Sequence, residues 1–324
     1  MAEASTVLLT GATGFVGHRL YEALRASGHR VRCMTRDEAK ARARSPDREW
    51  VQADVGDEAS LTRAMEGCHA AYYLVHGLAE GRGYRRREVE AAERFARQAA
   101  AAGLSRIVYL GGIAPQGKPS EHLRSRLEVG EALRTGKVPT VELRASMIIG
   151  HKSLSWLIVR DLAARLPAMV LPRWLHSRTE PVGIDDVIVA LVRALELDVR
   201  GSVDFDLPGP EVMTGREILE RAARVCGRRH PVIIEVPMLT PWLSSQWLRF
   251  ITRADFRVAR ELVSGLSHDV LARDGRYWQL IGHTKRQTFE QAARKAIEEE
   301  LAEGCEVRGP WGKVERGLDR FWAG

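Results

Sequence analysis

The sequence has few cysteines, and their spacing does not suit a metal site or a redox dithiol. Cys33, Cys68, Cys226 and Cys305 stand far apart in a chain of 324 residues and form no C-x-x-C pair. That spacing argues against zinc-binding and thioredoxin-like motifs. We therefore expect free, reduced thiols and no metal site.

Long hydrophobic runs are also missing. The most apolar long stretch, residues 154–171, is interrupted by Arg160, Asp161 and Arg165, so it is too charged to cross a bilayer. The amino terminus passes directly into an apolar strand pattern, without the basic and apolar segments of a signal peptide. These features predict a soluble, cytoplasmic protein with no transmembrane segment.

Positive charge is in excess but is not concentrated on one segment. The formal net charge is +7, yet the basic residues are scattered among 42 acids, apart from the short run at residues 85–87. No basic stripe with interleaved aromatic residues is present, so we expect no nucleic-acid partner. An excess of positive charge would equally suit a phosphorylated cofactor.

Residues 6–17 form the segment around which the rest of the chain is organised. They read T-V-L-L-T-G-A-T-G-F-V-G, and the short apolar run at their start predicts a buried strand. From Phe15 onward, apolar residues recur at three- and four-residue steps as far as Gly28, which predicts a helix. A second predicted strand, residues 29–35, follows at the distance of a βαβ unit.

The three glycines of this segment lie at the predicted strand-to-helix joint. Gly11 would allow a tight turn, Gly14 would let backbone N–H groups approach a diphosphate, and Gly17 would let the helix lie close to the strand. A diphosphate would then lie at the positive end of the helix. This context favours dinucleotide binding over an ordinary turn.

Strand and helix patterns then alternate along the chain. Further strands are predicted at residues 49–53, 70–75, 106–110, 140–145 and 203–207, with helices at 60–66, 85–102 and 121–131. This alternation predicts an α/β fold with a doubly wound, parallel, Rossmann-type sheet and a ligand at the strands' carboxyl ends. We expect residues 1–152, with a returning segment at 180–208, to form this domain. Residues 153–179 and 209–324 would form a smaller, mainly helical lobe.

The G-x-x-G-x-x-G spacing of the first glycines resembles the extended and atypical short-chain dehydrogenase/reductase superfamily. The segments Y-Y-L-V-H, H-L-R-S-R, E-L-R-A-S-M-I-I-G and P-R-W-L are similar to a narrower group, the NAD(P)-binding proteins akin to NmrA-type regulators and the complex I accessory subunit. The likeness covers residues 6–210. It implies cofactor contacts from Gly11, Thr13, Gly14, Phe15, Val16, Gly17, Arg36, Asp54, Val55, His76, Gly112 and Arg126.

The end of the second predicted strand bears on the choice between NADP(H) and NAD(H). Thr35 occupies the place where related NAD-binding sequences carry an acid, and the next residue, Arg36, would favour a 2′-phosphate. We therefore expect NADP(H). A register slip of two residues would instead place Asp37 at the acid position, so NAD(H) stays open as the alternative.

Two further positions have both a structural and a functional interpretation. Asp54 with Val55 matches the family's acid-plus-aliphatic pair beside the adenine, but an Asp after a strand is also typical of a turn. His76 ends the fourth predicted strand, which in the family runs under the cofactor's ribose. A histidine there can also simply cap the backbone.

The family's catalytic set, a Ser and a Tyr-x-x-x-Lys, is absent. Gly111 or Gly112 stands near the serine place, His122 aligns with the tyrosine and Arg126 with the lysine. None of the six tyrosines has a lysine four residues later. His122 could itself donate a proton, with Arg126 holding the ribose or phosphate. Alternatively, His122 only caps the helix start and Arg126 is a cofactor clamp in a protein without this chemistry.

The carboxyl-terminal half offers compositional clues to a substrate. Between residues 239 and 256 it contains Trp242, Trp247, Phe250 and Phe256 with few charges, and Trp156 and Trp174 precede this stretch. They suit an aromatic-lined apolar pocket or the ordinary core of a small lobe. Asp185 or Asp186 is expected to cap the helix that begins in the segment P-V-G-I-D-D-V.

We therefore expect an NADP(H)-binding atypical member of the superfamily that reduces a hydrophobic small molecule. A catalytically silent NADP(H) sensor or scaffold, or a non-redox enzyme of the same fold, is the alternative. The missing Ser-Tyr-Lys set favours the alternative. A second lobe with an apolar, tryptophan-rich stretch favours a substrate pocket.

Overall fold

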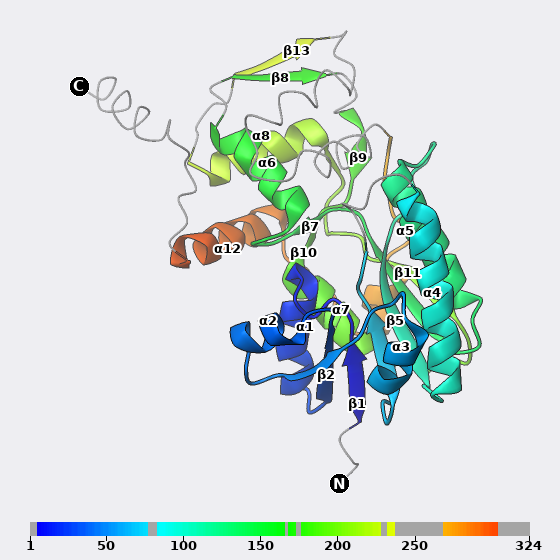
Figure 1. Ribbon diagram of the computed structural model, residues 1–324. Coiled ribbons are helices and arrows are strands. Elements are labelled where there is room, and N and C mark those ends of the chain that lie inside the picture. The colour runs from blue at the N-terminus through cyan, green and yellow to red at the C-terminus, as the bar shows by residue number, and fades with distance from the viewer. Residues whose placement is uncertain are drawn as a thin grey trace.

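The protein is described from a computed structural model, which covers residues 5–76, 83–165, 168–172, 176–227, 232–236 and 268–303 (Figure 1). Five of the aromatic residues proposed for a substrate pocket lie outside the described residues. They are Trp174, Trp242, Trp247, Phe250 and Phe256.

A seven-stranded sheet forms the centre of the fold, in the order β11-β6-β5-β4-β1-β2-β3. Its strands are β1 (Thr6–Leu9), β2 (Arg30–Thr35), β3 (Glu49–Gln52), β4 (Ala70–Tyr73), β5 (Arg106–Gly112), β6 (Thr140–Ala145) and β11 (Val203–Asp206). Every neighbouring pair is parallel. The predicted doubly wound parallel sheet is confirmed. Its strand order reverses between β1 and β4, where such sheets open a crevice at their carboxyl ends.

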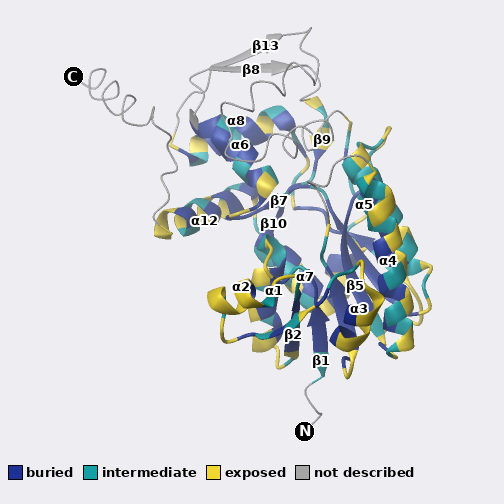
Figure 2. Cartoon of the chain, in the orientation of Figure 1, coloured by how far each residue is buried: buried dark blue, intermediate teal, exposed yellow. Residues whose placement is uncertain are grey.

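Helices cover both faces of this sheet (Figure 1). They are α1 (Phe15–Ala26), α2 (Glu38–Arg44), α3 (Glu58–Met65), α4 (Tyr84–Ala101), α5 (Glu121–Arg134) and α7 (Ile184–Ala194). On one face, Val7 and Leu9 of β1 pack with α1 and α7, whereas Leu8 packs on the other face with α3, α4 and α5. Because both faces are covered, the central strands are buried throughout, as Figure 2 shows, and read as continuous apolar runs.

A second group of elements lies beyond the carboxyl ends of the strands (Figure 1). Helix α11 (Arg276–Leu280) does not belong to it, because Tyr277 and Trp278 of α11 pack in the core of the main sheet. The second group contains α6 (Leu154–Arg165), α8 (Gly215–Val225), α12 (Phe289–Ala302) and the strand pairs β7 (Ile148–Ile149) with β10 (Val182–Gly183), β8 (Ala168–Pro172) with β13 (Val232–Val236) and β9 (Arg178–Thr179) with β12 (Met213–Thr214). Of these, α6, α8 and α12 pack together around Trp156 and Phe289. The predicted boundaries between the two parts of the chain stay a prediction.

Helix α7 begins differently from the sequence-based expectation. The prediction that Asp185 or Asp186 caps it was wrong, because Gly183 is the N-cap residue and makes no side-chain cap. Asp186 lies in the first turn and is buried. Its carboxylate accepts from Nε2 of His283 at 2.7 Å and from the backbone N–H of Gln287 at 2.9 Å. It therefore holds the chain that leads into α12 against the start of α7.

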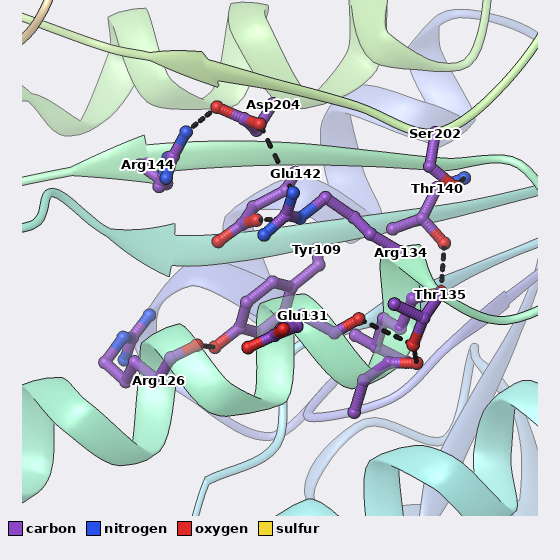
Figure 3. A network of polar contacts seen from close by, with 12 residues as sticks. Tyr109, Arg126, Glu131, Arg134, Thr135, Thr140, Glu142, Arg144, Ser202 and Asp204 are labelled. Carbon is purple, nitrogen blue, oxygen red and sulfur yellow. Dashed lines mark hydrogen bonds and ion pairs between the residues drawn. The ribbon is translucent and has the colours of Figure 1, made fainter.

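An ionic network lies at the β6 side of the sheet (Figure 3). The Glu142 side chain is only 1% exposed, and its Oε2 lies 2.8 Å from Nε of Arg134 on α5. Burial raises the pKa of Glu142, and the neighbouring arginines oppose that rise. Arg144 pairs with Asp204 and, at 3.1 Å, with Asp206. The network thus ties β11 to β6 and to α5.

Two further observations bear on sites outside this network. Within the described ranges, no helix is long and apolar enough to span a membrane. Nor does the described part of the chain contain a group of three or more histidine, cysteine or acidic side chains placed to hold a metal ion. Cys33, Cys68 and Cys226 are buried and none of these three is in a disulfide, and Cys305 lies outside the described residues.

Candidate functional site

A cavity of about 480 Å³ opens at the carboxyl ends of the central strands. It is lined by the loop between β1 and α1, the ends of β4 and β5, the first turns of α5, and the chain from the end of β6 into α6. These segments meet where the strand order reverses, because parallel strands bring their carboxyl ends to one edge of the sheet.

The glycines of the β1–α1 loop are required by the local backbone. Gly11 has a φ of +66°, and a Cβ there would lie 2.6 Å from the carbonyl oxygen of Leu74. A Cβ on Gly17 would overlap the carbonyl oxygen of Gly11, so α1 can begin this close to the loop only with glycine at that position. Both positions therefore have the roles predicted from the sequence.

The start of α1 fits the diphosphate of a dinucleotide. Gly14 is its N-cap residue, it provides no side-chain cap, and the first turn contains no acidic residue. The first N–H groups of a helix have no partner within it, so here they are available to an anion. The space beside Gly14 is nearly empty, because the Gly11 oxygen, at 3.2 Å, is the one neighbour that a Cβ there would meet. The approach to these N–H groups is therefore open.

The cavity brings together most of the residues proposed from the sequence as cofactor contacts. Gly11, Gly14, Phe15, Val16, Gly17, His76, Gly112 and Arg126 all line it. Thr13, Arg36, Asp54 and Val55 do not: Thr13 is exposed on the loop, and the other three follow the ends of β2 and β3. Their cofactor contacts stay a prediction.

The acidic residues after β2 and β3 are used by the local backbone. Strand β2 ends at Thr35, and Asp37 caps α2 by accepting from the N–H of Lys40 at 2.9 Å. Asp54 accepts from the N–H of Gly56 at 2.7 Å, which forms the turn before α3. Arg36, by contrast, is exposed.

The position aligned with the family's serine is filled from the neighbouring helix. Gly112 is the last residue of β5, and a Cβ there would lie 2.6 Å from Cδ1 of Leu123 on α5. The Leu123 side chain thus occupies the space into which a serine would project. Gly111 faces Glu142 and Tyr109 instead.

His122 does not cap α5, so that interpretation was wrong. Ser120 is the N-cap residue, and its Oγ accepts from the backbone N–H of Leu123 at 3.3 Å. The half-buried imidazole of His122 lines the cavity instead, with its ring centroid 6.1 Å from that of His76.

Both histidines are neutral at physiological pH. Burial, followed by the charge of Arg126, lowers the pKa of His76 to about 3. The same two causes, with a smaller effect of His76, lower the pKa of His122 to about 3. His76 is exposed by its accessible surface, because it opens onto the cavity, but the protein atoms around the ring still disfavour its charged form. Each neutral ring offers one N–H donor and one acceptor nitrogen.

Arg126 is held at the end of β5. Its Nη2 donates to the carbonyl oxygen of Leu110 at 2.5 Å, and its own carbonyl oxygen accepts from the Tyr109 hydroxyl at 3.0 Å (Figure 3). The guanidinium therefore supplies a fixed positive charge beside the two neutral histidines.

The far part of the cavity is apolar. Its wall includes Met147, Leu154, Ile158 and Val159. These residues are not among those proposed from the sequence, although the apolar helix pattern that begins at residue 154 is a signal that points to them. Trp156 belongs to the core rather than to the pocket, because it is 0% exposed and packs against Phe289.

Comparisons with known proteins agree with this geometry. A family model described as NAD(P)H-binding matches residues 11–164. The chain is 30% identical over 236 residues to a ceramide reductase of Caulobacter vibrioides, covering 71% of this chain and 73% of that protein. It is 31% identical over 232 residues to the (4-alkanoyl-5-oxo-2,5-dihydrofuran-3-yl)methyl phosphate reductase of Streptomyces griseus, and the match covers 68% of this chain and 74% of that protein. The Citrobacter sp. triphenylmethane reductase complexed with NADP(H) has a similar fold, with a TM-score of 0.69 at 15% identity over 90% of this chain and 99% of that one.

Proposed function

Because this chain belongs to the atypical, NmrA-like branch of the NAD(P)-binding short-chain dehydrogenase/reductase superfamily, we propose that it is an NADP(H)-dependent reductase of a hydrophobic small molecule. One observation carries the proposal: a single cavity begins at the glycine loop and continues among apolar side chains of α6. A pocket of this kind suits a cofactor and an apolar substrate side by side.

The residues after β2 support NADP(H) as the cofactor. The exposed Arg36 can make a charge-assisted contact with a 2′-phosphate. Thr35 offers no carboxylate to a ribose 2′-hydroxyl, and Asp37 is already engaged as the N-cap of α2. Gly11, Gly14 and the first turn of α1 would hold the diphosphate. When bound, the nicotinamide would supply the hydride.

We assign His122 the role of orienting the substrate. A neutral imidazole can donate its N–H to the substrate oxygen on which negative charge develops, without a full positive charge of its own. His76, 6.1 Å away between ring centroids, provides a second donor in the same part of the cavity. Burial, followed by the charge of Arg126, keeps both rings neutral, and the fixed guanidinium adds a favourable potential for that oxygen.

The apolar wall supports a hydrophobic substrate. Leu154 and Ile158 lie one helical turn apart on α6, and both contribute to the cavity. The two relatives are named as reductases of a ceramide and of an alkanoyl-substituted compound, and each of these compounds contains an alkyl chain. A substrate with an apolar portion would bury that portion against α6.

A catalytically silent NADP(H) sensor or scaffold is the second candidate, and a specific observation favours it. The chain lacks the Ser-Tyr-Lys set, and the Leu123 side chain fills the space at Gly112 that a serine would use. A non-redox enzyme of the same fold would account for the same substitutions.

An NADPH-consumption assay separates these candidates. NADPH absorbance is followed with a panel of apolar carbonyl, enone and quinone compounds, and any co-purified ligand is identified by mass spectrometry. We expect oxidation of NADPH with at least one compound, and a raised KM in Ile158→Asp. The control Leu280→Asp, at a 58% exposed position on α11, should behave like the wild type. Tight NADPH binding without consumption by any compound would favour the sensor.

A further inference from the structure

Lys152 has an unusual backbone conformation at the edge of the cavity. Of the described non-glycine residues, only Lys152 has a positive φ, 72°. That left-handed conformation costs an L-residue roughly 1 kcal/mol and is often found at binding sites. Lys152 lines the same cavity as Gly14 and Phe15.

The loop that contains Lys152 lies against the first turn of α1. A Cβ on Gly150 would be 2.8 Å from Cζ of Phe15, so the backbone of the loop and the start of the helix are in close contact. The charge of Lys152 also reaches α1. Burial and the charge of Arg48 are the main causes of the lowered pKa of His18, and Lys152 adds to them. Lys152 therefore belongs to the wall of the cavity on the side where α1 begins.

The present partner of Lys152 is an exposed carboxylate. Its Nζ donates to Oε1 of Glu303, the C-cap residue of α12, at 2.6 Å, and the two side chains are 60% and 49% exposed. His151 lies 3.1 Å from the other oxygen of Glu303. The hydrogen bond from Lys152, followed by that from His151, lowers the pKa of Glu303 to about 2. An ion pair this exposed contributes little stability, so another anion can compete for the lysine.

The other cation of the cavity is not free to move in this way. Among the described residues that line the cavity, the arginine and lysine side chains are those of Arg126 and Lys152. Arg126 is bound to the carbonyl oxygen of Leu110. The long side chain of Lys152, by contrast, is mostly in solvent and can turn from Glu303 towards the start of α1.

We propose that Lys152 is an anion-binding residue of this site. Its ammonium group breaks the ion pair with Glu303 and pairs instead with a phosphate group bound beside the first turn of α1. The proposal rests on the proposed function, because the phosphate would belong either to the NADP(H) diphosphate or to a phosphate ester on the substrate. The helix start and the ammonium would then act on the same anion, and their attractions would add.

Calorimetric titration of NADPH into matched variants tests the proposal. Lys152→Asn removes the charge with a residue that tolerates a positive φ, and Lys152→Gly does so without backbone strain. If the diphosphate is the partner, the Kd should rise about twofold to fivefold in both variants, the range expected for an exposed ion pair. The Kd should also depend less on salt concentration. Lys152→Arg should stay near the wild type, and Glu303→Gln should bind more tightly. Lys137→Ala, which removes an exposed lysine before the start of β6, is the control.

A second titration, of inorganic phosphate into NADPH-saturated protein, distinguishes the two sources of the phosphate. An unchanged Kd for NADPH, with phosphate binding lost in Lys152→Asn, assigns the lysine to a substrate phosphate. Unchanged affinity for both NADPH and phosphate in Lys152→Asn and Lys152→Gly overturns the proposal. A wild-type protein that binds no dinucleotide contradicts the proposed function instead. In that case, inorganic phosphate is titrated into the protein without NADPH. Phosphate binding that is lost in Lys152→Asn supports the proposal, and phosphate binding that is unchanged in Lys152→Asn overturns it.

Discussion

The imidazole rings of His76 and His122 lie in one cavity, with their centroids 6.1 Å apart and their planes inclined by 76°. One ring follows the end of β4 and the other lies in the first turn of α5. Burial and the charge of Arg126 keep both rings neutral. His122, which aligns with the catalytic tyrosine of the superfamily, thus has a second neutral hydrogen-bonding group beside it, the ring of His76.

Replacing His122 with alanine should slow turnover of the true substrate. Loss of its N–H donor should lower kcat by roughly two orders of magnitude, the smaller end of the range for general acid–base groups. The Kd for NADPH should barely change. Steady-state kinetics and calorimetry measure the two effects separately.

The control for this variant is His69→Ala, because His69 lies at the amino end of β4, away from the cavity, and bonds to Ser105. Turnover that survives His122→Ala would exclude the assigned role and direct attention to His76. The pH profile gives a second check. With a pKa of about 3, His122 should produce no limb near pH 6.5.

Acid should destabilise the protein through the same two histidines. Their pKa is about 3 in the folded chain and 6.5 as the ordinary value. Between these pH values the unfolded chain binds more protons, so the free energy of unfolding falls as the pH is lowered from 6.5 towards 3. Above pH 6.5 the contribution is fully present.

Urea denaturation at a series of pH values measures this dependence. The double variant His76→Gln/His122→Gln should show a flatter decline than the wild type. Carboxylates that titrate in the same window contribute equally to both proteins, so the difference isolates the histidines. Equal slopes would mean that the folded state does not disfavour the charged imidazoles.

Local sequence patterns predicted the sheet and the glycine loop because those features depend on residues close together in the chain. The apolar run at residues 6–9 and the glycines at 11 and 17 each determine a strand or a turn through short-range sterics. The caps were harder to predict. A serine two residues earlier, rather than His122, satisfies the start of α5.

The candidate site was predicted only in part, because the missing features depend on contacts between distant segments. No local pattern indicates that Leu123 fills the space at Gly112, or that Lys152 meets Glu303. The neutrality of His122 likewise depends on burial and on the position of Arg126 in the folded chain. Side-chain packing across elements, rather than periodicity, determines these features.

The glycine loop offers a contrast between binding and folding. Gly14→Val should abolish NADPH binding and leave the fold intact, because a Cβ there meets only one atom, at 3.2 Å, in a backbone with φ of −83°. Gly17→Ala should instead destabilise the protein, since its Cβ would overlap the Gly11 carbonyl. Circular dichroism, thermal denaturation and NADPH titration check both variants. A folded Gly14→Val protein that binds NADPH normally would contradict the assignment of the diphosphate to this loop.

The choice of cofactor should depend on Arg36. Its exposed guanidinium follows β2 directly, so we expect NADPH to bind more tightly than NADH. Arg36→Ala should reduce that preference by about tenfold, the loss expected for one hydrogen bond to a charged group, and leave the Kd for NADH unchanged. Arg42→Ala is the matched control, because it removes an arginine on α2 that pairs with Glu38. Calorimetric titration of both cofactors into the three proteins measures the preference.

A preference that persists in Arg36→Ala would mean that another group recognises the 2′-phosphate. Tighter binding of NADH by the wild type would mean that Asp37 contacts the ribose and is drawn away from the N–H of Lys40, so α2 should then lose its cap when the cofactor binds.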